Sequence, residues 1–418
     1  MQDEARSGTS RAFLGAAAFY TATAIPMSYV FYLLPAQLRE AGHSATTISL
    51  LALVYLPYAL RALWAPAIDR YARGDARRFK IVLAACAAMA VPAVLAFGLV
   101  EPAGQIASIM TIAAVLFVIL STGTTGLDGY TVATLGEGDR RHASIWQTVG
   151  FTVGGVVLGL GAMLAGGLAW STVVVLIALA TAVAALPILA LPAARPSRAV
   201  SIDGTGPGEG GSTGAFLRNP AVRRLLCISL LSKMGLGMIA GYLPILQVDY
   251  GVSASQAGFF GAFGSNVLGL GSALVGGWFL LRIGGLRAIG VMGLVAAVFF
   301  ALAALTHETL RSPAFAITLT LIFLSLGYAF IAPFKALSLA VSDGPRCASR
   351  AATLASVDLS LSILAASVSG SLVTALGLES FLWLSMALCL AAAGVALRTA
   401  RGRPDGLSAS TTERLPLP

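Results

Sequence analysis

Residues 46–80 read TTISLLALVYLPYALRALWAPAIDRYARGDARRFK, an apolar run that ends in a cluster of basic residues. The same arrangement recurs along the chain, in which about twelve apolar runs alternate with polar connections. Basic residues occupy every second connection, and only four of the 27 Lys and Arg depart from this rule. Because Lys and Arg remain in the cytoplasm during membrane insertion, this placement predicts that both termini are cytoplasmic. The exceptions are Arg39 and Arg311 in the opposite connections and Lys233 and Lys335 inside apolar runs.

The composition also predicts a membrane protein. Of the 418 residues, 57% are hydrophobic and 11% are charged, whereas about 25% of the residues of a soluble domain are charged. A soluble fold of this length cannot hide so much apolar surface, but a helical protein surrounded by lipid can. Each run holds at least about 18 residues, enough to cross a hydrocarbon core of roughly 30 Å. We therefore expect an all-α membrane protein with twelve transmembrane helices, near residues 12–38, 46–66, 79–99, 106–134, 143–165, 170–191, 221–248, 254–281, 287–305, 313–341, 349–375 and 380–397.

The net charge of +9 does not indicate a nucleic-acid-binding protein. The basic residues are spread over the connections, so membrane topology and contact with anionic lipid explain them. The cysteines have no metal-ligand spacing and none lies in an expected external loop, which argues against zinc sites and disulfides. The histidines lie in expected loops without a nucleophile–base arrangement, so the sequence indicates no enzyme, cofactor or metal site. These residues are Cys86, Cys227, Cys347, Cys389, His43, His142 and His307.

A Gly-rich stretch divides the chain into two halves. Residues 203–214 read DGTGPGEGGSTG, which is typical of a flexible linker. We expect an N-terminal six-helix bundle over residues 1–191, a cytoplasmic linker over 192–220, a C-terminal six-helix bundle over 221–400 and a cytoplasmic tail over 401–418. Residues that recur in order in both halves favour duplication of a six-helix unit. Pro35, Gly42, Ser44 and Ala45 correspond to Pro244, Gly251, Ser253 and Ala254, all at an offset of 209.

Two such halves are the architecture of the major facilitator superfamily of secondary transporters, and the connection after the second helix resembles the loop motif of that superfamily. The motif reads Gly-x-x-x-Asp-Arg/Lys-x-Gly-Arg-Arg/Lys; Asp69 and Arg70 match it, with Ala65 in place of the first Gly. The resemblance implies an ion network at helix ends that latches the halves on the cytoplasmic face. The alternative is a solvated cluster that only sets topology. The residues expected in this cytoplasmic gate are Asp69, Arg70, Arg77, Arg78, Arg140, Arg141 and Arg282.

A shorter stretch resembles two branches of the superfamily, the siderophore permeases (RhtX/FptX-like) and the muropeptide permeases (AmpG-like). Residues 56–70 read LPYALRALWAPAIDR, and these families carry Pro-Tyr, a basic residue, Trp-Ala/Ser-Pro and Asp-Arg at this place. Asp128, followed by Gly129 and Tyr130, is a second match near the end of the fourth helix. Muropeptide permeases are usually longer, so the expected twelve-helix length favours the siderophore group.

Four ionisable residues lie inside expected helices: Asp128 on the fourth, Lys233 on the seventh, Lys335 on the tenth and Asp358 on the eleventh. An ionised side chain at mid-helix costs about 2.5–3.5 kcal/mol on insertion scales, so such groups usually face the bundle interior or water. In the superfamily, helices 3, 6, 9 and 12 face lipid, and these four residues lie on other helices. The alternative to a role in transport is a static salt bridge between helices.

The alignment of the halves places Asp128 and Lys335 within one helical turn of equal depth, and we expect a pair that breaks and reforms as the halves rock. One acid, Asp128 or Asp358, would carry a proton, because the gain or loss of a nearby cation switches the protonation of a buried carboxyl group. Lys233 or Lys335 would attract an anionic substrate.

Four further polar residues are expected along the substrate and proton pathway. Tyr58 and Arg61 lie three residues apart on one helix face inside the recognised stretch, although snorkelling to the interface is the alternative for Arg61. Gln147 and Asn266 are the uncharged candidates.

The resemblance implies a proton-coupled importer of a siderophore across the bacterial inner membrane, working as a monomer by alternating access. The partners would be the small-molecule substrate, protons and membrane lipids, with no nucleic acid and no cofactor. One alternative is uptake of muropeptides or another anionic metabolite. An alternative from another class is a non-transporting receptor or sensor on the same fold.

Overall fold

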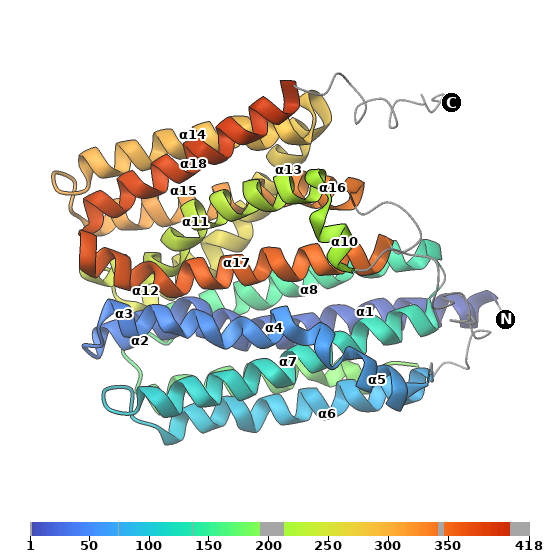
Figure 1. Cartoon of the computed structure of the whole chain (residues 1–418). Coiled ribbons are helices and arrows are strands. Elements are labelled where there is room, and N and C mark those ends of the chain that lie inside the picture. Colours follow the sequence, from blue (N-terminus) through green and yellow to red (C-terminus); the bar gives the residue numbers. More distant parts are fainter. Residues whose placement is uncertain (1, 74, 136, 193–212, 342–346, 402–418) are drawn as a thin grey trace. The chain divides into compact units, whose positions relative to one another are not determined.

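The computed structural model describes the backbone of residues 2–73, 75–135, 137–192, 213–341 and 347–401. Within these ranges all regular structure is helical, as the sequence predicts (Figure 1). In the described part of the chain, eleven helices are long and apolar enough to cross a membrane, and the count becomes twelve if the bent pair Ala45–Leu60 and Ala65–Ala72 is taken as one span. The chain is therefore a multi-pass, all-α membrane protein.

The first half of the chain contains long helices interrupted by short π and 3-10 segments. Its elements are α1 (Gln2–Ser28), the π-helix η1 (Tyr29–Leu33), α2 (Leu34–Glu40), α3 (Ala45–Ser49), the 3-10 helix η2 (Leu50–Tyr55), α4 (Leu56–Leu60), the 3-10 helix η3 (Arg61–Leu63), α5 (Ala65–Ala72), α6 (Ala76–Leu95), the 3-10 helix η4 (Ala96–Leu99), α7 (Ile106–Thr134), α8 (Glu137–Leu164), α9 (Trp170–Ala185) and the 3-10 helix η5 (Leu186–Ala190).

The second half is built in the same way. Its elements are α10 (Thr213–Arg218), α11 (Pro220–Asp249), α12 (Ala254–Gly258), the π-helix η6 (Phe259–Gly264), α13 (Ser265–Ile283), α14 (Gly285–Thr306), α15 (Pro313–Ala329), α16 (Ile331–Val341), α17 (Cys347–Leu376) and α18 (Leu378–Arg401).

The helix expected over residues 46–66 is not continuous. Residues 45–60 and 65–72 form two helical pieces bent by 42° relative to each other. Pro57 and Pro66 each lie in the first turn of a new helix, where the missing N–H costs nothing but the preceding helix cannot continue. Arg61 consequently begins a 3-10 turn at the bend instead of lying within a regular α-helix.

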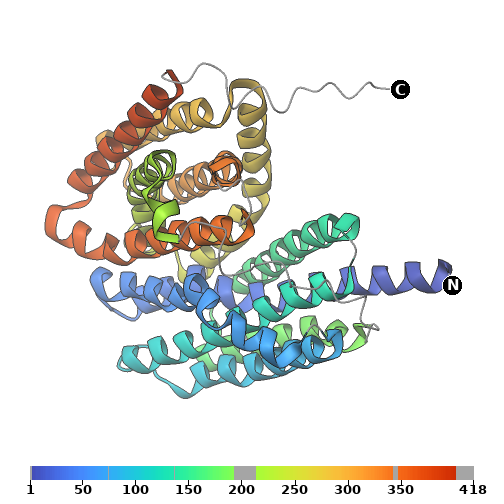
Figure 2. The same ribbon diagram turned by 45° about the vertical axis from the view of Figure 1, so that its right-hand side comes forward.

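Small residues let neighbouring helices approach closely. In α8, a side chain at Gly150 would collide with the backbone of Ala17 on α1, and the Cβ of a residue replacing Gly154 would lie 2.6 Å from the Thr21 carbonyl oxygen. The Thr21 hydroxyl donates to the Gly150 carbonyl at 3.0 Å. Glycines on α8 thus allow α1 and α8 to pack backbone to backbone, as small residues do between membrane helices. Other pairs that pack side by side are α6 with α7 and α14 with α18 (Figures 1 and 2).

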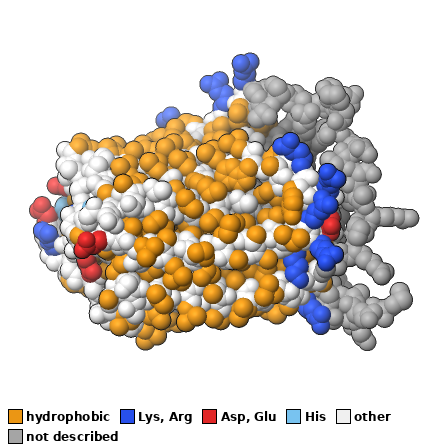
Figure 3. Space-filling view, turned by 90° about the horizontal axis from the view of Figure 1, so that it is seen from below, with side chains coloured by type: hydrophobic (Ala, Val, Ile, Leu, Met, Phe, Trp, Pro, Cys, Tyr) orange, Lys and Arg blue, Asp and Glu red, His pale blue; other side chains and the backbone are white. Residues whose placement is uncertain are grey.

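Many large apolar side chains remain exposed, which suits a lipid environment. Leu99, Leu164 and Leu281 are among those that face outward almost completely. Figure 3 shows a broad band of hydrophobic side chains on one face, with most of the visible Lys and Arg at one edge and most of the visible Asp and Glu at the other. A band of this kind between two polar edges is the surface that a bilayer covers.

The chain forms two compact units whose boundaries run through helices. Unit 1 comprises residues 1–204 and 244–267, and unit 2 comprises residues 205–243 and 268–418. The end of α11, all of α12 and η6, and the start of α13 therefore group with the first half of the chain. In unit 1, a buried apolar cluster that includes Phe19, Phe79 and Tyr130 packs the ends of α1, α6 and α7 that lie nearest the basic connections.

Candidate functional site

In unit 1, Arg61 and Asp128 form a loose ion pair. Arg61 Nη1 lies 3.9 Å from Asp128 Oδ2, and the two side chains are 37% and 49% exposed. Asp128 belongs to α7, while Arg61 stands at the bend after α4. No hydrogen bond from the guanidinium group to another described residue accompanies this contact, so its N–H groups remain available to a further anion.

Tyr58 contacts both α7 and the Arg61 side chain. Its hydroxyl lies 2.6 Å from the Thr124 hydroxyl on α7, and the Arg61 guanidinium carbon lies 5.5 Å from the centre of the Tyr58 ring. Thr124 and Asp128 are four residues apart and therefore share one face of α7. The structure thus brings Tyr58 and Arg61, which were predicted to share one helix face, together with Asp128 of another helix.

In unit 2, Lys233 and Asp358 form a tighter pair. Lys233 Nζ lies 3.2 Å from Asp358 Oδ2, with the side chains 27% and 35% exposed. Ser229, one helical turn before Lys233 on α11, donates its hydroxyl to Asp358 Oδ1 at 2.6 Å. Both oxygens of the α17 carboxylate therefore have a partner on α11. The sequence shows Ser229 and Lys233 on one helix face, but it does not show that Asp358 lies opposite them.

Among the described residues, the remaining predicted pathway residues make no hydrogen bond or salt bridge with the ion pair of their own unit. Lys335 lies on α16 with an exposed side chain, and its expected pairing with Asp128 links two units and stays a prediction. Asn266 is buried and donates Nδ2 to the Ala262 carbonyl at 2.7 Å, with its amide packed against Gly155. Gln147 is half-buried on α8.

The predicted cytoplasmic gate residues make local contacts. Asp69 and Arg70 are exposed on α5, and Arg70 Nε donates to the Pro66 carbonyl of its own helix at 3.2 Å. Asp75 caps α6 by accepting from the Arg77 N–H at 2.8 Å. Arg78 Nη1 donates to the Tyr71 carbonyl at 3.0 Å, and Arg78 Nε lies 3.9 Å from Asp75 Oδ2. The Arg282 guanidinium carbon lies 5.8 Å from the Trp278 ring centre. The Arg140 and Arg141 side chains lie outside the described residues, and the network between the halves stays a prediction.

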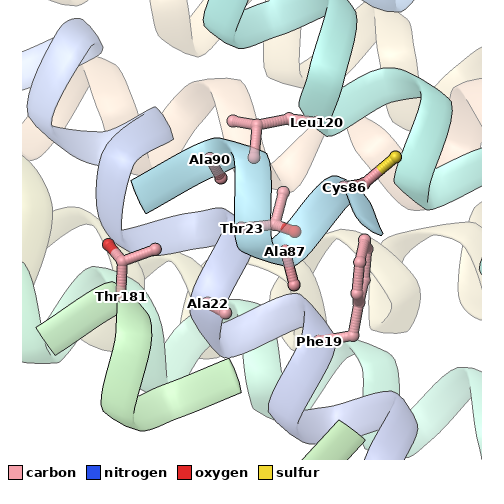
Figure 4. A pocket seen from close by; sticks show the side chains of 8 residues that line it. All are labelled: Phe19, Ala22, Thr23, Cys86, Ala87, Ala90, Leu120 and Thr181. Atoms are coloured by element: carbon pink, nitrogen blue, oxygen red, sulfur yellow. The ribbon is translucent and has the colours of Figure 1, made fainter. Parts of the chain in front are cut away.

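Small pockets lie elsewhere. Figure 4 shows one in unit 1, with an empty volume of about 240 Å³, where α1, α6, α7 and α9 meet. Its lining is mostly apolar and includes Phe19, Thr23 and Cys86, but none of the predicted site residues. The pocket therefore adds no support to the predicted transport site.

Sequence reasoning missed a pair at the end of the unit 1 helices opposite to the basic connections. Arg39, at the end of α2, binds the Asp249 carboxylate through two hydrogen bonds of 2.6 and 3.0 Å. The sequence held two indications of this pair. Arg39 is one of two basic residues in the connections that otherwise lack them, and Asp249 follows Pro244, the counterpart of Pro35.

Solved structures with the same fold are transporters. A bacterial homologue of the human lysosomal transporter Spinster, in an inward-facing and unoccupied conformation, superposes with a TM-score of 0.71 at 18% identity, covering 94% of this chain and 97% of that one. The nucleoside transporter NupG superposes with a TM-score of 0.66 at 16% identity, covering 94% of this chain and 98% of that one. At such identities the likeness shows the fold alone.

Sequence comparison gives the family. An uncharacterized protein of Haemophilus influenzae is 28% identical over 146 residues, which cover 33% of this chain and only 34% of that relative. The sequence model of the Major Facilitator Superfamily matches residues 12–357, which is most of the chain. The protein therefore belongs to the major facilitator superfamily of transporters.

Proposed function

We propose that this protein is a proton-coupled secondary transporter that imports a siderophore across the bacterial inner membrane by alternating access. The observation that carries the proposal is the presence of two partly exposed ion pairs, Arg61–Asp128 and Lys233–Asp358. Of these residues, Asp128, Lys233 and Asp358 lie inside helices of membrane-spanning length. Ionised groups at such places are costly in lipid and typically mark the path of a substrate or ion.

Arg61 suits the recognition of an anionic substrate. Its distance of 3.9 Å to Asp128 exceeds that of a hydrogen bond, so the planar guanidinium group can still offer paired N–H donors to an oxyanion. The Tyr58 ring beside it supports the guanidinium group through a cation–π contact. Siderophores carry oxyanion groups of this kind, and the stretch over residues 56–70 that resembles siderophore permeases contains both side chains.

Asp358 is the acid that we assign to the proton. Its carboxylate has a cation and a hydroxyl donor on α11, so a proton taken up there releases Lys233 and loosens the contact of α17 with α11. Moving one charge through a potential of 100 mV supplies about 2.3 kcal/mol, which can drive accumulation. We further propose a monomer with both termini in the cytoplasm.

The test is iron uptake in a deletion strain. Iron-starved cells with the wild-type chain or an empty vector receive a panel of purified siderophores, each free or loaded with radioactive iron. We expect at least one to support growth and uptake only with the chain, and a protonophore to abolish the uptake. A chain that supports uptake of none of them contradicts the siderophore assignment.

An anionic cell-wall fragment is the second candidate, because the same uncommitted guanidinium group would bind its carboxylate. Uptake of labelled muropeptides by the same strains separates the two substrates. Persistence of either uptake after addition of a protonophore would contradict coupling to protons.

A further inference from the structure

A second pocket lies in unit 2, at the end of its helices nearest the basic connections. It is partly open, has an empty volume of about 390 Å³ including its mouth, and lies between the first turns of α11 and α14 and the last turns of α16 and α18. Its lining is largely apolar and includes Leu225, Ile228, Leu286 and Leu337, while Arg224 brings a charged group to the same lining. Apolar walls with a few polar groups are typical of ligand sites.

The walls of the pocket are apolar toward the membrane interior and basic toward the helix ends. Arg224 and Ile228 lie on one face of α11, because residues four apart on a helix are neighbours. Leu337 lies one turn before the end of α16 and packs against the start of α14, where a Cβ at Gly285 would be 3.0 Å from Leu337 Cγ. Ile228 and Leu337 are buried, whereas Arg224 is exposed. The pocket therefore suits a molecule with an apolar part and an anionic end.

Further exposed arginines adjoin the pocket. Each lies next to a lining residue or two residues beyond one, and they are Arg223, Arg287, Arg398 and Arg401. Neither these four nor Arg224 forms an ion pair with another described residue. In the described part of unit 2, the carboxylates lie elsewhere, because Glu308 and Glu379 are at the opposite helix ends and Asp358 pairs with Lys233. The positive charge around the pocket is thus available to an anion from outside the chain.

The corresponding place in unit 1 is filled. The pocket lies between the seventh, ninth, tenth and twelfth spans, whose counterparts in the first half are α1, α6, α7 and α9. At the basic end of those helices, a side chain at Gly129 would collide with the Phe79 ring, and one at Gly15 would collide with Leu191. Lys80 Nζ donates to the Leu191 carbonyl at 2.7 Å. The pocket in unit 2 is therefore a property of that half and does not follow from the shared fold.

We propose that this pocket binds one anionic phospholipid from the leaflet on the side of the basic connections. The phosphate group lies among the arginines, whose planar guanidinium groups pair with phosphate oxygens. Part of one acyl chain lies between Leu225, Ile228 and Leu337. A soluble anion would leave this apolar wall in water, whereas a lipid covers it, and basic pockets between helices suit such headgroups. The lipid site does not rest on the proposed function.

The test is photo-cross-linking of the full-length protein in phosphatidylcholine nanodiscs. The probe is phosphatidylglycerol or phosphatidylcholine with a photoreactive group in its acyl chain, and mass spectrometry identifies the labelled residues. We expect phosphatidylglycerol to label the pocket residues Leu225, Ile228 or Leu337 at least about fivefold more than phosphatidylcholine, because each basic residue near an anionic lipid contributes roughly 1 kcal/mol. Both probes should label the outward-facing Leu281 equally. Unlabelled phosphatidylglycerol should displace the pocket label, but glycerol 1-phosphate, which lacks acyl chains, should not.

Variants separate the two parts of the site, and the label at Leu281 reports that each variant is folded and inserted. Arg224→Gln should lower the pocket label about fivefold, whereas Arg224→Lys should keep most of it. Arg11→Gln, an exposed basic residue at the same end of α1, is the matched control. Leu337→Trp fills the chain site without changing the arginines and should abolish the pocket label. Leu274→Trp, at an exposed position, should not.

Thermal unfolding gives a second readout, because a ligand that binds the folded state stabilises it. Phosphatidylglycerol should raise the Tm of the solubilised wild type more than phosphatidylcholine does, and Leu337→Trp should lose this difference. Equal pocket labelling by both probes would mean ordinary surrounding lipid, and displacement by glycerol 1-phosphate would mean a site for a soluble anion. No pocket labelling by either probe would mean that the chain itself covers the pocket. Each of these results overturns the lipid site and leaves the uptake experiments unaffected.

Discussion

The two ion pairs of the candidate site differ in how fully each carboxylate is bound. Asp358 has a cation at 3.2 Å and a hydroxyl donor at 2.6 Å, whereas Asp128 has one cation at 3.9 Å and is 49% exposed. A carboxylate with both oxygens engaged changes its surroundings when it is protonated, because both contacts depend on its charge. The loosely paired Arg61 guanidinium group can instead donate its N–H groups to a substrate anion. The difference suggests a proton site in unit 2 and an anion site in unit 1.

The largest effect is expected at the tighter pair. Asp358→Asn removes the charge that balances Lys233 and should reduce concentrative uptake to the level of an empty vector. The measurement is accumulation of the identified substrate in cells with equal amounts of transporter in the membrane. Ser360→Ala, two residues away on α17, is the control and should accumulate normally, because the Ser360 hydroxyl donates to the Ser356 carbonyl of its own helix. Normal accumulation by Asp358→Asn would show that Asp358 is not the proton site.

The next experiment tests the predicted partner of Asp128 in the other half. Asp128→Asn and Lys335→Ala should each abolish uptake while membrane insertion is retained, and the charge exchange Asp128→Lys with Lys335→Asp should recover part of it. Uptake assays with surface labelling of the inserted protein provide the measurement. If both single variants retain wild-type uptake, the pair has no part in transport.

A smaller effect is expected for Arg61→Lys. The lysine keeps the charge but loses the planar pair of donors, so KM for an oxyanion substrate should rise about tenfold with little change in the maximal rate, which corresponds to roughly 1.4 kcal/mol of binding. Initial-rate uptake over a range of substrate concentrations measures this. A change in the maximal rate alone would indicate that Arg61 acts in the conformational step and does not bind the anion.

The smallest effect is expected for Ser229→Ala, which removes one donor to Asp358 but leaves Lys233 in place. Loss of one hydrogen bond to a charged group should lower the uptake rate by about tenfold, the factor that corresponds to roughly 1.5 kcal/mol. Ser232→Ala, on the same helix and without an ion-pair contact, serves as the comparison. If Ser229→Ala is as damaging as Asp358→Asn, the hydroxyl group itself must take part in proton transfer.

Much of the fold can be predicted from the sequence, because length and hydropathy alone decide which segments cross a bilayer. The predicted spans near residues 106–134 and 221–248 correspond closely to α7 and α11. The bend at residues 61–64 was not predicted, although Pro57 and Pro66 were visible on either side of it. The helix propensities of single residues indicate where a helix can start, but tertiary packing decides whether the chain bends there.

The candidate site could be predicted only in part. The cost of a charge in lipid singles out Asp128, Lys233 and Asp358 from the sequence, but partners depend on which helix faces approach each other. That Asp358 faces Ser229 and Lys233 follows from the packing of α17 on α11, which periodicity does not specify. Arg39 and Asp249 were visible as charges near the ends of repeated segments, yet their contact depends on how α11 packs.

The most direct test of proton coupling at Asp358 is counterflow in proteoliposomes. Asp358→Asn should still exchange labelled for unlabelled substrate across the membrane, because exchange needs the substrate site and its movement but no net proton transfer. The same vesicles should fail to accumulate substrate when an inward proton gradient is applied, although wild-type vesicles do. Accumulation by the variant at the wild-type level would contradict the account.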